Sequence, residues 1–158
     1  MNRRFNLILL GWLSAFASVL GLFSCKPANS VTDVNAALQR YSDCVLRMDS
    51  AGIADLFAPD GVVANPGQPN IVGPVAVKKF LDQFKDFKVQ AYTIDPKRTS
   101  VTGATAEQAG TYRQRVQLPN KKVIEVSGHF RTTWIRTDDG RWLIRRMETI
   151  PDPQSRGG

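Results

Sequence analysis

Few side chains in this 158-residue chain could combine as acids, bases, nucleophiles or metal ligands. The chain has one histidine, His129, and two cysteines, Cys25 and Cys44, with no Cys-x-x-Cys pair. A zinc site needs about three or four such ligands, so the sequence predicts no metal and no other cofactor. His129 is the residue type most often used in acid–base catalysis. Asp60 or Glu148 would need burial to act as a base.

The overall composition is typical of a globular domain, with 22% charged and 42% hydrophobic residues. The formal net charge is +7, which favours anionic surfaces such as membrane headgroups. The basic residues are spread over several predicted strands and turns, without an arginine-rich run or interleaved aromatic residues. We therefore interpret them mainly as solvated faces and expect no binding to nucleic acid.

The N-terminal segment resembles a bacterial lipoprotein signal. An uncharged apolar stretch, Leu7–Phe23, follows two arginines and closes on Leu22-Phe23-Ser24-Cys25, which resembles a lipobox except for its phenylalanine. The resemblance implies a diacylglycerol on the Cys25 sulfur, cleavage of a signal peptide at 1–24, and a tether at 25–31. The expected location is then the cell envelope, with Cys25 as the membrane anchor. The alternatives are an ordinary cleaved signal, giving a secreted or periplasmic protein, and an uncleaved signal anchor.

The chain beyond the tether predicts helices first and strands afterwards. Apolar residues at helical spacing predict a helix over 32–48 and a second, short helix near 50–58, which Pro59-Asp60-Gly61 should end. A short strand at 62–64 and a loop up to Gly73 follow. Pro74 should begin a third helix that reaches about Phe87.

Alternating apolar residues predict five strands in the second half of the chain. Turn signals such as Asp95-Pro96 separate them, and the last two should form a hairpin around Asp139-Gly140. Helices followed by antiparallel strands indicate an α+β domain over 32–150, with a disordered tail at 151–158. The predicted strands are 88–95, 98–102, 105–118, 122–137 and 141–150.

Local motifs along residues 32–150 resemble the SnoaL-like domains of the nuclear-transport-factor-2-like superfamily. The resemblance implies a cone-shaped fold, in which a curved antiparallel sheet wraps around N-terminal helices and leaves a central pocket. The motifs are Gln39-Arg40-Tyr41, the stretch Ala54–Gly61, Asn65-Pro66 with Gly73-Pro74-x-Ala76, and the closing stretch Asp139–Ile144.

The ketosteroid isomerase branch offers the nearest comparison for catalysis. Those enzymes use a helix tyrosine and a protonated aspartate as oxyanion donors, and a second aspartate as the general base. Tyr41 matches the tyrosine, but Asn65 stands where the base should be and Gly128 stands at the second donor position. An amide cannot abstract a proton near neutral pH, and glycine offers no side-chain donor. The resemblance therefore argues against isomerase chemistry.

The same comparison predicts which strand residues face the pocket. With Gly128 inside, the alternation of side chains places the even-numbered residues of this strand inside and His129 and Arg131 outside. On the last strand it points Arg145 and Met147 inward, although a β-bulge would reverse that direction. The outer face, with His129, Arg131 and Thr133, is expected to form a homodimer contact.

These comparisons yield a predicted ligand-binding set with a structural alternative for most members. Tyr41 could be a core tyrosine, Asn65 a turn cap, Phe130 and Trp134 core residues, and Arg145 an exposed arginine instead of a selector of anionic or polar groups. The predicted set is Tyr41, Asn65, Val126, Phe130, Trp134, Arg145 and Met147.

Three functions remain open at this point. The first hypothesis is an envelope-anchored pocket domain that binds a small, mainly apolar ligand or a partner protein without catalysis. The second is a SnoaL-like or isomerase-type enzyme with its acid–base groups placed differently. The third is a structural dimerisation module whose cavity is filled by its own side chains.

Overall fold

The computed structural model describes residues 30–153, so the predicted signal peptide and Cys25 lie outside the described residues. The helices are α1 (Val31–Leu46), α2 (Ser50–Asp55) and α3 (Pro74–Leu81), the last continued by the 3₁₀ turn η1 (Asp82–Phe84). The strands are β1 (Phe57–Ala64), β2 (Ile71–Val72), β3 (Lys88–Thr102), β4 (Thr105–Gln117), β5 (Val123–Arg136) and β6 (Trp142–Pro151).

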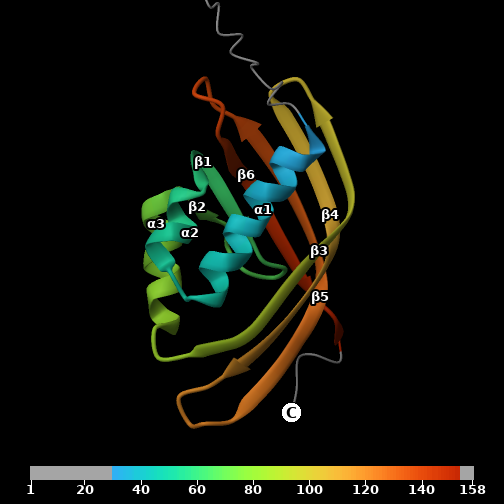
Figure 1. The fold of residues 1–158 in the computed structure, drawn as a ribbon. Coiled ribbons are helices and arrows are strands. Elements are labelled where there is room, and N and C mark those ends of the chain that lie inside the picture. The colour runs from blue at the N-terminus through green and yellow to red at the C-terminus, as the bar shows by residue number, and fades with distance from the viewer. Residues whose placement is uncertain (1–29, 154–158) are drawn as a thin grey trace, which may run out of the picture.

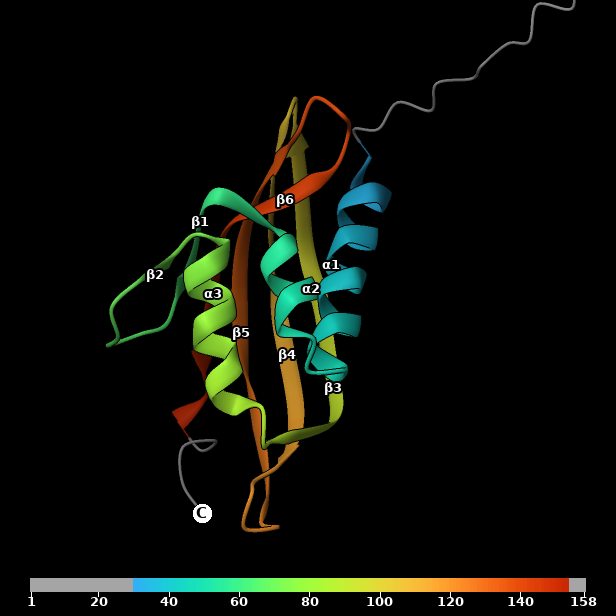
Figure 2. The same ribbon diagram turned by 90° about the vertical axis from the view of Figure 1, so that its left-hand side faces the viewer.

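The strands form one curved six-stranded sheet in the order β2-β1-β6-β5-β4-β3. All pairs are antiparallel except β1 and β6, which run parallel. The three helices lie together against the concave face (Figures 1 and 2). This arrangement confirms the predicted α+β class and the curved sheet wrapped around N-terminal helices.

Helix α1 begins with a capping box. The Ser30 side chain accepts a hydrogen bond from the Asp33 backbone N–H, and the Asp33 carboxylate accepts from the Ser30 backbone N–H. Two orphan donors of the first turn are thereby satisfied. The buried face of the helix carries Val34, Ala37 and Leu38, and the helix packs across β3.

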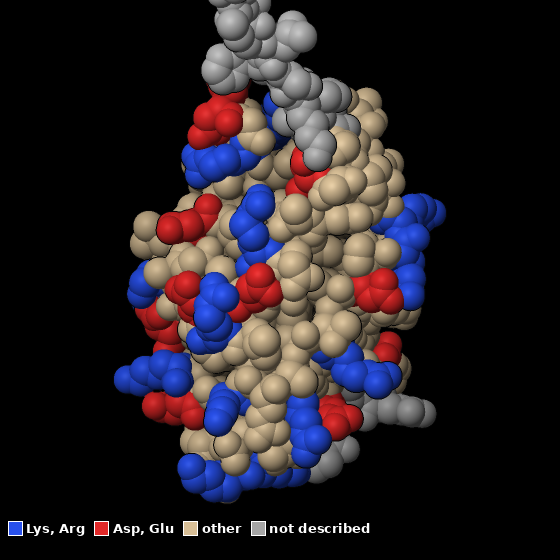
Figure 3. Space-filling model, viewed as in Figure 1, with Lys and Arg blue, Asp and Glu red and all other residues tan. Residues whose placement is uncertain are grey.

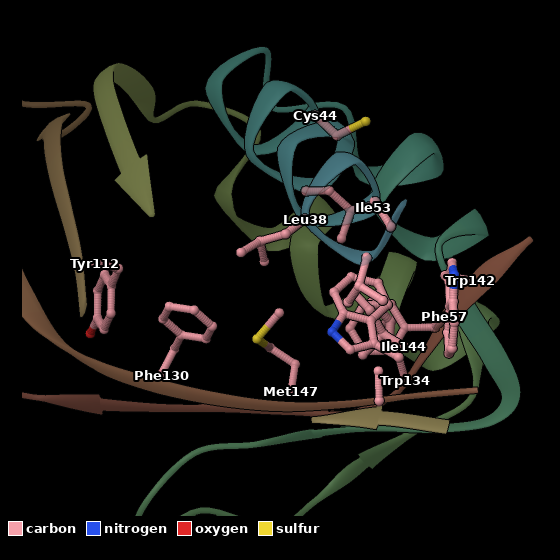
Figure 4. Close-up of a cluster of buried hydrophobic side chains, with 14 residues drawn as sticks. Leu38, Cys44, Ile53, Phe57, Tyr112, Phe130, Trp134, Trp142, Ile144 and Met147 are labelled. Carbon is pink, nitrogen blue, oxygen red and sulfur yellow. The ribbon is translucent and has the colours of Figure 1, made fainter. Parts of the chain in front are cut away.

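The main core lies between α1 and the centre of the sheet. Leu38 points from the helix toward Phe130, Trp134 and Met147, which rise from β5 and β6 (Figure 4). Each of these four side chains is almost fully buried. Burial of such side chains stabilises a fold by roughly 1.5–3 kcal/mol each, so this contact holds the helix layer on the sheet.

A polar network ties α1 to three strands beside this core. The Trp134 indole N–H donates to Gln108 Oε1 at 2.9 Å, and Gln108 Nε2 donates to Asn35 Oδ1 at 2.8 Å and to Thr99 Oγ1 at 3.1 Å. Gln108 is only 3% exposed. Its buried carboxamide therefore has hydrogen-bond partners on α1, β3 and β5 at once.

Two boundaries in the first half of the chain differ from the prediction. Pro59-Asp60-Gly61 does not end a helix: α2 stops at Asp55, and the tripeptide lies inside β1, which starts at Phe57. The register of β1 against β6 shifts between Phe57 and Val62, so turn-forming residues sit in a bulge of the strand. Within the predicted loop, Ile71 and Val72 pair with β1 as β2.

Asp95-Pro96 is likewise not a turn: both residues pair with β4, next to a bulge at Lys97. Residues 88–102 form the single strand β3, whose register against β4 shifts between Pro96 and Arg98. Proline has no backbone N–H to donate. It is tolerated at this position because β3 is an edge strand, with a neighbouring strand on one side only. The predicted tail also begins too early, since β6 reaches Pro151 and the Asp152 N–H donates to the Ser127 carbonyl at 2.9 Å.

No helix within residues 30–153 combines the length and apolar character needed to cross a lipid bilayer.

Gln108→Ala should destabilise the fold by about 1–3 kcal/mol, because it leaves the buried Trp134 N–H without an acceptor. Urea unfolding would measure this loss. Gln114→Ala is the matched control, since Gln114 is a partly buried glutamine of the same strand whose side chain forms no hydrogen bond with another group of residues 30–153. Equal losses in the two variants would show that the network contributes nothing specific.

Candidate functional site

A cavity of about 380 Å³ lies between the helices and the concave face of the sheet. Ligand pockets usually begin at about 300 Å³. Most of the wall is apolar, and the polar groups come from a few side chains. The apolar lining consists of Val45, Met48, Ile53, Phe57, Val63, Val77, Phe80, Leu81, Phe84, Phe87, Val89, Val116, Ile124 and Met147.

The cavity opens beside η1. Asp82 and Lys85 are the exposed members of its lining, whereas the others are buried or half-buried. This mouth lies where α3 ends and β3 begins, at the lower end of the molecule in Figure 1.

Three tyrosines supply much of the polar lining: Tyr41 from α1, Tyr92 from β3 and Tyr112 from β4. The rings of Tyr41 and Tyr92 meet edge to face, with centroids 6.5 Å apart. Within residues 30–153 none of the three hydroxyls forms a hydrogen bond with another protein group. The phenols are therefore available to a ligand that accepts hydrogen bonds.

The environment keeps these phenols protonated. Burial, and next the neighbouring Tyr112, raise the pKa of Tyr41 to about 12. Burial, followed by the other two phenols, raises the pKa of Tyr92 well above its usual value. Burial and then Asp152 also raise the pKa of Tyr112. Near neutral pH the three hydroxyls can donate a hydrogen bond but cannot serve as a general base.

Asn65 lines the cavity at the end of β1. The Thr149 hydroxyl donates to Asn65 Oδ1 at 3.0 Å. With its oxygen engaged in this way, the amide presents its nitrogen as a further donor. Asn65 stands at the general-base position of the isomerase comparison. It faces the cavity there but offers a neutral hydrogen-bond donor.

Gly128 occupies its position for a steric reason. A Cβ atom there would lie 2.2 Å from the Ile150 carbonyl oxygen and 2.8 Å from the Pro151 Cα. The close approach of β6 to β5 therefore excludes any side chain, including the aspartate expected as the second oxyanion donor. Gly128 is buried, as are Phe130, Thr132 and Trp134 of the same alternation, which confirms the predicted inward face of β5.

Asp82 is the one carboxylate among the lining residues that the structure describes. It accepts hydrogen bonds from Lys78 at 2.7 Å and from Ser50. The hydrogen bond from Lys78, and then that from Ser50, lower the pKa of Asp82. A carboxylate held ionised at an exposed rim is a weak base, so the lining offers no group suited to proton abstraction.

The other candidate bases lie away from the cavity. His129 is on the outer face, its side chain 67% exposed, with Nε2 3.9 Å from Asp152 Oδ1. Glu148 contributes to a polar groove on the same outer face, and Asp60 is exposed near Arg145. The outward direction of His129 and Arg131 is confirmed, while the homodimer through this face stays a prediction.

The structure brings together three of the seven residues predicted to bind a ligand. Tyr41, Asn65 and Met147 line the cavity. Phe130 and Trp134 are 1% exposed core residues and do not line it. Val126 is half-buried on the concave face, packed against the core but outside the lining.

The predicted inward direction of Arg145 is wrong. Thr133 pairs with Arg146 and Trp134 pairs with Ile144, so Arg145 is the extra residue of a β-bulge. The bulge lets Ile144 and Met147 both point inward. Arg145 is 57% exposed, with Nη2 3.8 Å from Asp60 Oδ2.

The sequence reasoning missed Tyr92, Tyr112 and the phenylalanines of the mouth. The alternation of side chains along β3 and β4 places each tyrosine on one face, but only the pairing of the strands shows that this face is the concave one.

No group of three His, Cys, Asp or Glu side chains in the described part of the chain could hold a metal ion.

Comparison with solved structures supports the fold. A ketosteroid isomerase-like protein from Erwinia carotovora atroseptica is 17% identical with a TM-score of 0.69, over 76% of this chain and 94% of that one. ActVI-ORFA from Streptomyces coelicolor is 17% identical with a TM-score of 0.63, over 77% and 96%. A putative aromatic ring hydroxylase from Novosphingobium aromaticivorans is 16% identical with a TM-score of 0.64, over 78% and 94%.

No curated protein sequence matches the chain significantly. Residues 27–148, however, match the SnoaL-like domain family, a stretch that includes α1, the three tyrosines, Asn65 and Met147. The chain therefore belongs to the SnoaL-like domain family.

Proposed function

We propose that this domain binds a small, mainly apolar ligand in its cavity and does not transform it. The observation that carries the proposal is the chemistry of the wall: neutral hydrogen-bond donors on an apolar surface, with no group suited to proton abstraction among the described lining residues. Members of this family bind small ligands and sometimes act as isomerases or cyclases. A donor-rich wall without a base supports the binding role.

The size of the cavity favours ligand binding over a purely structural role. A structural dimerisation module would fill its interior with its own side chains, whereas about 380 Å³ remain here. An enzymatic role is the second candidate, because the Tyr41 phenol could polarise a carbonyl group. It would require a proton acceptor that the lining within residues 30–153 does not supply.

We also propose that the domain is anchored in the cell envelope through acylated Cys25. This proposal rests on the lipobox-like Leu22-Phe23-Ser24-Cys25 after a basic, apolar leader. Several acyl chains would hold the domain firmly, since each buried CH₂ group contributes roughly 0.8 kcal/mol.

Filling the cavity should weaken the binding of a neutral apolar probe. The fluorescent dye phenylnaphthylamine should bind the unaltered protein, and Val63→Phe should weaken its binding at least tenfold, since Val63 lines the cavity. Val72→Phe is the matched control, because Val72 is 55% exposed on β2. Melting temperatures would establish that both variants fold. Absence of dye binding to the unaltered protein would refute the binding role.

The unaltered protein should not isomerise a β,γ-unsaturated ketone. Asn65→Asp places a carboxylate at the cavity wall with little change in volume and keeps an acceptor for the Thr149 hydroxyl. This variant should gain slow activity, because a positioned base contributes roughly 10²–10⁴-fold.

Adding Tyr41→Phe should lower that activity by removing an oxyanion donor. A spectrophotometric assay of the conjugated product would measure all three proteins. Clear isomerisation by the unaltered protein would overturn the non-catalytic proposal.

Cys25→Ser should release the domain from the membrane fraction and remove a mass increment of acyl size. Fractionation with mass spectrometry of the intact protein would measure both effects. Retention of the variant in the membrane with residues 1–24 still attached would indicate a signal anchor instead.

A further inference from the structure

Basic side chains gather around the mouth of the cavity. Lys85 lines the mouth itself, and Lys88 precedes Val89, another lining residue. Lys121 and Lys122 occupy the turn between β4 and β5, at the same end of the sheet, and all four lysines are exposed. Figure 3 shows Lys and Arg side chains along this lower end of the molecule.

Two carboxylates lie beside these lysines: Asp82 in the lining, and Asp86, which is exposed between Lys85 and Lys88 in the sequence. Asp82 is already engaged by Lys78 and Ser50, although Lys85 also attracts it. Within the described residues, Lys85, Lys88 and Lys121 form no ion pair within 4.0 Å. The mouth therefore presents an excess of ammonium groups.

An aromatic wall lies just inside the mouth, next to Lys85. Phe80 and Phe84 meet edge to face with centroids 5.3 Å apart, and Phe84 and Phe87 do so at 5.4 Å. All three rings are partly buried and line the cavity. An apolar body would be desolvated against these rings while an attached charge remained at the surface.

We propose that the ligand is an amphiphilic anion: its apolar body occupies the cavity, and its carboxylate, sulfonate or phosphate headgroup lies at the mouth near Lys85, Lys88 and Lys121. This inference rests on the proposed binding function and specifies the class of ligand. The phenols of the inner wall stay neutral. They need only a hydrogen-bond acceptor, which is an atom of the apolar body or a bound water molecule. The selectivity for an anion thus resides at the mouth and not in the interior.

Two fluorescent dyes that differ by one charged group test the proposal. Anilinonaphthalene sulfonate carries a sulfonate that phenylnaphthylamine lacks, and the two are otherwise the same. At low ionic strength the protein should bind the sulfonate roughly tenfold more tightly, because three exposed ion pairs each contribute modestly. The preference should shrink toward equality in molar salt. Val63→Phe should abolish the binding of both dyes, which places them in the cavity.

The variant that combines Lys85→Gln, Lys88→Gln and Lys121→Gln should lose the preference for the sulfonate and keep the affinity for the neutral dye. A control with Lys97→Gln, Arg98→Gln and Arg141→Gln removes the same formal charge from exposed positions away from the mouth. It should retain the preference.

Equal affinity for the two dyes, or equal effects of the two triple variants, would overturn the anion proposal and leave the binding function standing. Binding of neither dye would instead refute the binding function itself, and the anion proposal with it.

Discussion

The close approach of β6 to β5 on the concave face is the constraint on which the rest of the structure depends. Gly128 permits this approach, because any Cβ would collide with the Ile150 carbonyl. The bulge at Arg145 shifts the alternation of side chains along β6 by one residue, so that Ile144 and Met147 both point into the core. A glycine and an extra residue are standard means of bending a sheet. The resulting curvature lets three helices cover one face while a cavity remains beneath them.

The cavity combines two kinds of polar group with different consequences. The phenols and the Asn65 amide are neutral donors in an apolar wall, where burial strengthens hydrogen bonds but holds the phenols in their protonated form. The lysines of the mouth are charged but exposed, so each contributes little to affinity and mainly discriminates among ligands by charge. In the proposed binding mode, this division separates the binding of an apolar body from the selection of its headgroup.

The two positions at which this chain departs from the isomerase comparison differ in their structural basis. Asn65 faces the cavity, so replacing it would place a carboxylate where a ligand could meet it. Gly128 could not be replaced in the same way, because the backbone of β6 occupies the space. The two lost catalytic positions therefore differ: one could be restored by a single substitution, and the other is closed by the packing of the sheet.

The sequence by itself determined the order of helices and strands and the inward face of β5, because each depends on residues close together in the chain. It also placed Tyr41, Asn65 and Met147 at the cavity. Only the tertiary structure decided the direction of Arg145, the incorporation of Pro59-Asp60-Gly61 into β1, and the meeting of Tyr92 and Tyr112 with Tyr41. The physical reason is that a strand's alternation fixes its faces only until a bulge shifts it, and a bulge is set by pairing with a strand distant in sequence.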